Sequence, residues 1–119
     1  MPIERNWIGF DLDGTIAIYT TYQGPGHIGP AIPAGIEIVK RLLAQGQHLK
    51  IFTARVASMY GKEAIAVERK AIEDWCLENI GQKLEVTSEK DGYLMEFYDD
   101  RCIPVEYNTG KILDTQKYI

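Results

Sequence analysis

Two aspartates that flank a leucine, Asp11 and Asp13, follow a short apolar run and precede Gly14. The run, residues 7–10, has the aromatic and β-branched composition of a buried strand, and Gly14 indicates a turn directly after it. Both carboxylates are therefore expected at the mouth of the strand, where they repel each other and favour a cation. Mg²⁺ prefers oxygen ligands and is often held by one or two carboxylates together with a substrate phosphate. For these two residues alone, a polar junction between strand and turn is the alternative.

The overall composition limits the kind of protein this is. A chain of 119 residues with 45% hydrophobic and 25% charged residues is typical of one globular domain, residues 1–119. Its 13 basic and 17 acidic residues give a net charge of -4, which argues against a general affinity for nucleic acid or anionic membranes. No signal-peptide pattern or membrane-spanning apolar run is found, so we expect a cytoplasmic protein without a membrane partner.

The order of apolar and polar residues predicts strands that alternate with helices. Strands are expected at residues 7–10, 49–52, 84–87 and 93–98. One helix should start at Pro33 and stop at Gly46, and a second should run from about Ser58 to Ile80 with Trp75 in the core. Apolar side chains recur in both segments at spacings of three and four.

The remaining segments predict little regular structure. Residues 16–22 are consistent with a small hairpin or flap, residues 24–30 form a loop dense in glycine and proline, and residues 103–105 could add an edge piece to the sheet. Cys76 and Cys102 match no zinc-ligand spacing, and we expect free core thiols rather than a disulfide.

These elements predict a Rossmann-like, three-layer α/β domain around a mainly parallel sheet with right-handed crossovers. In such sheets, ligands bind beyond the carboxyl ends of the strands. Three of the expected strands end in reactive side chains, namely Asp11 and Asp13, then Thr53, and finally Asp99 with Asp100. One edge of the sheet would therefore collect four carboxylates and a hydroxyl.

This collection of groups suits phosphoryl transfer. An attacking carboxylate needs an electrophile whose negative charge is neutralised, and Mg²⁺ shared between carboxylates and a phosphate oxygen does this. Covalent catalysis by an aspartate splits hydrolysis into two easier displacements. A second carboxylate that stays off the metal can protonate the leaving oxygen and later accept the proton of water.

Four ordered stretches of the chain resemble the sequence motifs of the haloacid dehalogenase (HAD) superfamily. They are Phe10-Asp11-Leu12-Asp13-Gly14-Thr15, Ile51-Phe52-Thr53-Ala54-Arg55, Lys90, and Phe97-Tyr98-Asp99-Asp100-Arg101. The resemblance implies a HAD-like fold and Mg²⁺ as the cofactor. An aspartate at the position of Asp13 is seen in the phosphatases and phosphotransferases of the family, which favours phosphate chemistry over carbon–halogen chemistry.

The resemblance also implies a role for each matching residue. Asp11 would be the nucleophile that forms an aspartyl-phosphate, and it would also contact the metal. Asp13 would be the general acid and base, and its backbone carbonyl would be a further metal ligand. Thr53 would bind the phosphoryl group together with the backbone N–H groups that follow Asp11, including that of Leu12.

The last two motifs complete the implied site. One or both of Asp99 and Asp100 would hold the metal, and Lys90 would neutralise the phosphate and the nucleophile. In the family this lysine precedes or opens a helix, but the link from Lys90 to Tyr93 is too short for a helix. Other lysines that could take the role are Lys62, Lys83 and Lys50.

Several of these residues have structural alternatives. Thr53 could cap the helix that follows it. His27 could touch a ligand, although a loop histidine is more often simply solvated. Arg55 and Arg101 could anchor substrate, although solvated ion pairs are the interpretation that we favour for both arginines.

The size of the chain bears on the substrate. Larger members of the family carry an inserted cap domain, whereas the only room here is the segment from Ala17 to Pro33. A minimal cap leaves the site open, which suits a bulky or polymeric phosphate or a homo-oligomer whose neighbour covers the cleft. A nucleotide, a sugar phosphate and the phosphorylated end of an oligonucleotide are therefore the substrates that we consider.

Together these features predict a Mg²⁺-dependent phosphomonoester hydrolase that acts through an aspartyl-phosphate. A non-catalytic HAD-like protein that binds phosphate or metal is one alternative. A phosphate-accepting receiver domain is another, but such domains place adjacent acids on the first strand and the acceptor on a middle strand. In this chain the acceptor-type motif comes first and the acid pair comes last.

Overall fold

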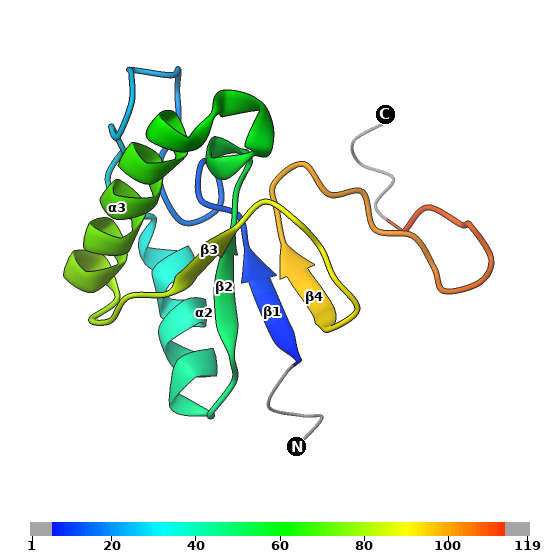
Figure 1. Ribbon diagram of the computed structural model, residues 1–119. Coiled ribbons are helices and arrows are strands. Elements are labelled where there is room, and N and C mark those ends of the chain that lie inside the picture. The colour runs from blue at the N-terminus through cyan, green and yellow to red at the C-terminus, as the bar shows by residue number, and fades with distance from the viewer. Residues whose placement is uncertain (1–5, 114–119) are drawn as a thin grey trace.

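The computed structural model describes residues 6–113, which fold around one β-sheet. Its four strands, all parallel, lie in the order β3-β2-β1-β4 (Figure 1). They are β1 (Trp7–Phe10), β2 (Leu49–Phe52), β3 (Glu85–Thr87) and β4 (Leu94–Tyr98). The α/β class and the parallel sheet are thus confirmed, and β1 occupies an inner position between β2 and β4.

Two helices connect the first three strands. α2 (Pro33–Ala44) begins with Pro33 at its first turn, as predicted, and Gly46 follows its end with a φ of 82°. α3 (Lys62–Asn79) starts four residues later than the predicted helix. The intervening residues form two short 3₁₀ helices, η1 (Ala54–Val56) and η2 (Ser58–Tyr60), and Gly61 at φ 82° separates them from α3.

Both helices pack on the same face of the sheet. Ile8 and Phe10 of β1 alternate with residues of opposite orientation, and they share a buried cluster with Ile51 of β2. Val39 of α2 and Ile72 of α3 join this cluster, and both are fully buried. Trp75 and Cys76 also belong to it, so the prediction of a core Trp75 is confirmed.

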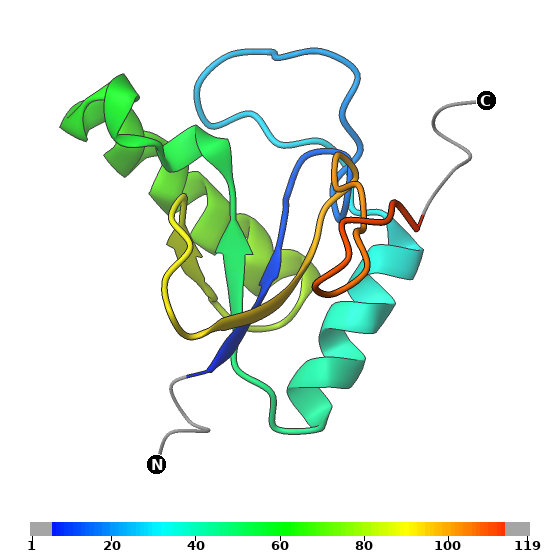
Figure 2. The same cartoon turned by 90° about the vertical axis from the view of Figure 1, so that its right-hand side faces the viewer.

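The opposite face of the sheet differs from the predicted three-layer arrangement. Right-handed crossovers in the order β3-β2-β1-β4 place α2 and α3 on one face, and they would place a helix between β3 and β4 on the other. The residues between these two strands form a short loop instead, and Figure 2 shows this loop on the side of the sheet opposite to α2. Within residues 6–113, the third layer is therefore a loop, and no helix covers Trp7, Phe52 and Phe97.

Other sequence predictions can be compared with the structure in the same way. Residues 16–22 form a loop with isolated bridges rather than a hairpin, and Val105 pairs with Ile112 outside the main sheet.

Cys76 is a buried core thiol, and burial raises its pKa to about 12. Cys102 is only half-buried, so its assignment to the core was wrong. No helix in the described part of the chain is long and apolar enough to cross a membrane.

Candidate functional site

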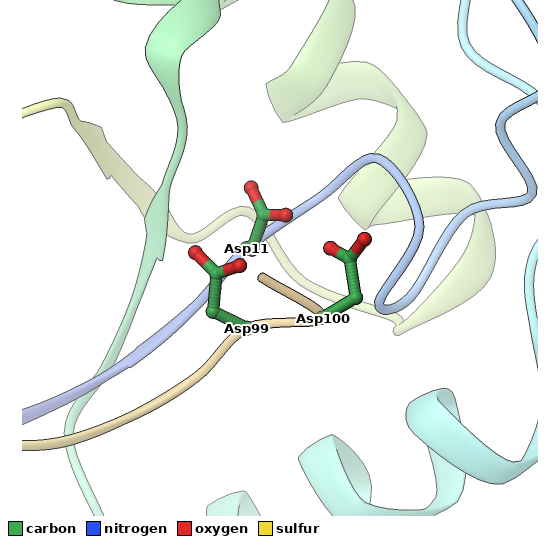
Figure 3. A group of neighbouring side chains, drawn as sticks. All are labelled: Asp11, Asp99 and Asp100. Carbon is green, nitrogen blue, oxygen red and sulfur yellow. The ribbon is translucent and has the colours of Figure 1, made fainter. Parts of the chain in front are cut away.

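Three carboxylates meet at the carboxyl edge of the sheet, where two adjacent strands end. Asp11 follows β1, whereas Asp99 and Asp100 follow β4, and the backbone N–H of Asp11 donates to the carbonyl of Tyr98 at 2.9 Å. One carboxylate oxygen of each aspartate lies within 4.8 Å of the others. Figure 3 shows the three side chains on the same side of the two chain segments. We call Asp11, Asp99 and Asp100 the acidic cluster.

A tight turn after β1 shapes this cluster. The buried Leu12 accepts hydrogen bonds through its carbonyl from the backbone N–H groups of Thr15, Ile16 and Ala17 at 3.3, 3.1 and 2.9 Å. Gly14 has a φ of 87°, and a Cβ atom there would lie 2.7 Å from a carboxylate oxygen of Asp100. The positive φ favours glycine at this position, and the absence of a Cβ atom lets Asp100 approach the turn closely.

Thr15 ties the same turn to the last strand. Its hydroxyl donates to Asp100 Oδ1 at 3.2 Å and accepts from the backbone N–H of Asp100 at 3.1 Å. Gly35 in the first turn of α2 lets the helix approach from the other side, because a Cβ atom there would lie 2.6 Å from the Thr15 carbonyl oxygen. The turn after β1 is therefore fixed from two directions.

The electrostatics of the acidic cluster favour a cation. Burial, the charge of Asp99 and the hydrogen-bonded side chain of Asp100 together raise the pKa of Asp11 to about 7, against a smaller lowering by the Leu12 N–H. Three crowded carboxylates that offer only oxygen atoms are a donor set suited to Mg²⁺. The residues present thus fit the predicted metal, with Asp11, Asp99 and Asp100 as the side chains that would hold it.

Asp13 lies outside this cluster and pairs with Arg55. Arg55 Nε donates to Asp13 Oδ2 at 2.7 Å, and Arg55 Nη2 donates to Asp13 Oδ1 at 2.9 Å. The Asp13 carboxylate is thus bound by Arg55 and is not part of the acidic cluster. Burial opposes the charge on Arg55, but the carboxylates of Asp13 and Glu68 outweigh it, and the pKa of Arg55 is raised.

The ion pair of Arg55 is therefore present, although it is not solvated as expected. The Arg55 side chain is 8% exposed, and its N–H groups already bind Asp13, Glu68 and the carbonyl of His27. A guanidinium with these partners is not available as a substrate anchor in this conformation.

Thr53 directly follows β2 and is buried. Its hydroxyl accepts from the backbone N–H of Arg55 at 3.2 Å, which caps η1. The capping alternative is thus observed, but for the short 3₁₀ helix rather than for the long helix. A hydroxyl that accepts one hydrogen bond can still donate its own proton, so capping leaves phosphate binding open to Thr53.

Lys90 is exposed in the loop between β3 and β4. The next residue, Asp91, accepts a hydrogen bond from the indole N–H of Trp7 at 2.9 Å, which draws the loop toward the strand that begins with Trp7. Among the described residues, no hydrogen bond or ion pair places Lys90 in the acidic cluster. Of the other lysines considered, Lys50 lies over the Trp7 ring at 4.7 Å and pairs with Glu85.

His27 and Arg101 are both exposed. His27 lies in the loop of residues 18–30, which with Arg55 lines a small cleft of about 100 Å³. Arg101 contributes its backbone N–H, which donates to Asp99 Oδ1 at 2.8 Å. A larger, open cleft of about 470 Å³ is lined by Gly14 and Thr15 of the turn and by residues at the end of β4 and in the segment that follows it.

Two residues of the site were missed in the sequence. Glu68 of α3 is 5% exposed, and it binds Arg55 and the backbone N–H of Gly26. Its signal was present, because an acid interrupts the apolar stripe of Ile65 and Ile72 at helical spacing. Thr15 stood within the first motif, but its bond to Asp100 joins residues 85 positions apart and leaves no local pattern.

Comparisons with known proteins bear on the fold. No protein-family model and no curated protein matches the chain. A solved structure of a protein from Bacteroides thetaiotaomicron, described as a conserved protein, is similar to it with a TM-score of 0.53 and 25% sequence identity. The match covers 91% of this chain and 81% of that chain. This similarity agrees with the α/β fold described above.

Proposed function

We propose that this protein is a Mg²⁺-dependent phosphomonoester hydrolase of the HAD-like type, with Asp11 as its nucleophile. The observation that carries the proposal is the separation of Asp11 from Asp13. Asp11 belongs to the acidic cluster, whereas the Asp13 carboxylate lies off that cluster on Arg55. Hydrolysis through an aspartyl-phosphate needs one carboxylate to attack phosphorus, and a second carboxylate that is held away from the cation can move the proton.

The chemistry divides into two displacements. The Asp11 carboxylate attacks phosphorus while the bond from phosphorus to the leaving oxygen breaks, and Asp13 protonates that oxygen. Water then attacks the phosphorus of the aspartyl-phosphate and gives a proton to Asp13, which frees Asp11 and inorganic phosphate. When bound, Mg²⁺ supplies the positive charge that lets an anionic carboxylate meet an anionic phosphate.

The buried hydroxyl of Thr53 and the backbone N–H groups after Asp11 are the groups proposed to hold the phosphoryl oxygens. Lys90, which is exposed in the loop before β4, remains a proposed partner of the phosphate. The open cleft of about 470 Å³ beside the acidic cluster suits a bulky leaving group such as a nucleotide, a sugar phosphate or an oligonucleotide end. A second copy of the chain over this opening is an alternative way to cover it.

The test is a phosphate-release screen with Mg²⁺ over these three substrate classes. We expect release by the unmodified protein and a loss of at least about 10³-fold in Asp11→Asn, because the nucleophile is removed. Asp74→Asn is the matched control, since Asp74 is an exposed acid on α3 and pairs with Lys70. Release that survives in Asp11→Asn would contradict the proposed nucleophile.

One observation favours a second candidate, a non-catalytic phosphate-binding or metal-binding domain. Arg55 donates to both carboxylate oxygens of Asp13, and an ion pair of this kind can have a purely structural role that requires no proton transfer by Asp13. The same screen separates the two candidates. Mg²⁺ binding without phosphate release from any substrate would favour the binding domain.

A further inference from the structure

Arg55 is a buried charged residue that joins four segments of the chain. It lies in η1 and contacts Asp13 in the turn after β1, Glu68 in α3 and residues of the loop 18–30. The side chains of Arg55 and Glu68 are 8% and 7% exposed, and that of Asp13 is 20% exposed. We call Asp13, Arg55 and Glu68 the Arg55 network.

The fork of the guanidinium fixes Asp13 in one orientation. Two N–H groups of Arg55 point at the two carboxylate oxygens of Asp13, with distances of 2.7 and 2.9 Å. A bidentate pair of this kind adds geometric specificity to charge attraction, and a lysine ammonium cannot reproduce it. The rotation of the Asp13 carboxylate is therefore set by Arg55.

The other contacts of Arg55 hold the loop 18–30. Arg55 Nη2 donates to the His27 carbonyl at 2.8 Å, and the guanidinium lies 5.8 Å from the centre of the Tyr22 ring. Glu68, at 3.4 Å from Arg55 Nη1, also accepts from the Gly26 N–H at 2.5 Å. The same guanidinium thus connects the loop over the site to the orientation of Asp13.

We propose that Arg55 is a positioning residue, which sets the Asp13 carboxylate for proton transfer and makes its orientation depend on the seated loop 18–30. This inference rests on the proposed function, in which Asp13 protonates the leaving oxygen. In this role Arg55 acts through Asp13 and does not itself react with the substrate. Substitution of Arg55 should therefore lower kcat most for substrates whose leaving group needs a proton.

The experiment compares two phosphate esters with different leaving groups. p-Nitrophenyl phosphate releases a stable phenolate that needs little protonation, whereas an alkyl ester such as glycerol phosphate releases an alkoxide that needs a proton. In Arg55→Lys we expect kcat for the alkyl ester to fall about 10²-fold, the low end of general acid catalysis, and kcat for the nitrophenyl ester to fall less than about threefold. Arg41→Lys, on the exposed last turn of α2, is the matched control and should leave both rates unchanged.

Amide hydrogen exchange tests whether Arg55 holds the loop 18–30 in place. We expect faster exchange in residues 18–30 of Arg55→Lys than in Arg41→Lys, because the loop loses an anchor. Tyr22→Leu serves if Arg55→Lys does not fold, since Tyr22 is 53% exposed and its ring only flanks the guanidinium. It should lower kcat for the alkyl ester alone, by about two- to fivefold.

The outcomes separate this inference from the proposed function. Equal losses for both esters, or no loss for either, would overturn the positioning role while leaving the phosphatase in place. Unchanged exchange in residues 18–30 would overturn the link to the loop. No phosphate from either ester with the unmodified protein would count against the proposed function itself, and the positioning role would fall with it.

Discussion

Asp11 and Asp13 lie two residues apart but face two different environments. Asp11 joins the acidic cluster, in which three carboxylates approach within 4.8 Å of one another. Asp13 joins the Arg55 network, in which two carboxylates surround one buried guanidinium. The Arg55 network contains its own cation, whereas the acidic cluster consists of acids only. This difference is the reason why we place the proposed cation at the acidic cluster.

Removal of Mg²⁺ should have the largest effect, and it should act on the acidic cluster alone. With EDTA, we expect phosphate release to fall by at least about 10³-fold, because the charges of nucleophile and phosphate are no longer neutralised. The measurement is phosphate release as a function of Mg²⁺ concentration, with Asp74→Asn as the control variant. Hydrogen exchange in the loop 18–30 should not change with EDTA. Activity that persists without any divalent cation would contradict the assignment of the cluster.

Loss of the guanidinium should have the next largest effect, on stability. In Arg55→Met, Asp13 and Glu68 remain as partly or fully buried acids without their cation, and we expect the free energy of unfolding to fall by about 3 kcal/mol. Urea denaturation measures this change. Lys70→Gln, which breaks the exposed pair with Asp74, is the control and should leave the urea midpoint unchanged. A similar midpoint in both variants would show that the network contributes no more than a surface pair.

Removal of one acid from the acidic cluster should have the smallest effect, and in the opposite direction. Without Mg²⁺ at neutral pH, we expect Asp11→Asn to be more stable than the unmodified protein by about 1–2 kcal/mol, a value reduced for solvent screening of this partly exposed group. The measurement is urea denaturation as a function of pH.

The pH dependence of that difference has a defined sign. The pKa of Asp11 is raised from 3.8 to about 7, so the folded protein keeps a proton that the unfolded chain loses at lower pH. This group therefore makes the unmodified protein less stable as pH rises from about 4 to about 7, and the change is absent in Asp11→Asn. Saturating Mg²⁺ should stabilise the unmodified protein more than the variant. An equal pH profile in the two proteins would contradict the raised pKa of Asp11, which burial and the neighbouring acids cause.

Local patterns predicted much of the fold and of the acidic cluster. The strands at 7–10 and 49–52 match the structure, because their apolar runs end in clear polar or glycine signals. The acids at the ends of β1 and β4 converge because parallel strands share a carboxyl edge. The sequence could not show where α3 begins, because Ser58–Tyr60 has helical composition but Gly61 adopts a φ of 82°.

The Arg55 network could not be predicted in the same way. Its bonds join Arg55 to Asp13 over 42 positions and to Glu68 over 13, and no periodicity relates residues at such separations. The sequence did indicate that no helix covers the second face of the sheet, because the link before β4 is too short for one. The handedness of the crossovers places both helices on the other face of the sheet. Phe97 is therefore left 40% exposed.

The most direct test of the proposed mechanism is to trap the phosphoryl group on the protein. A reaction with p-nitrophenyl phosphate and Mg²⁺ is quenched with acid during turnover, and the peptides are analysed by mass spectrometry. We predict a phosphoryl group on Asp11, its absence after EDTA treatment, and its persistence for longer in Asp13→Asn, in which water is no longer activated. A phosphoryl group on any other residue, or turnover with none on Asp11 under conditions that slow hydrolysis, would contradict the proposed mechanism.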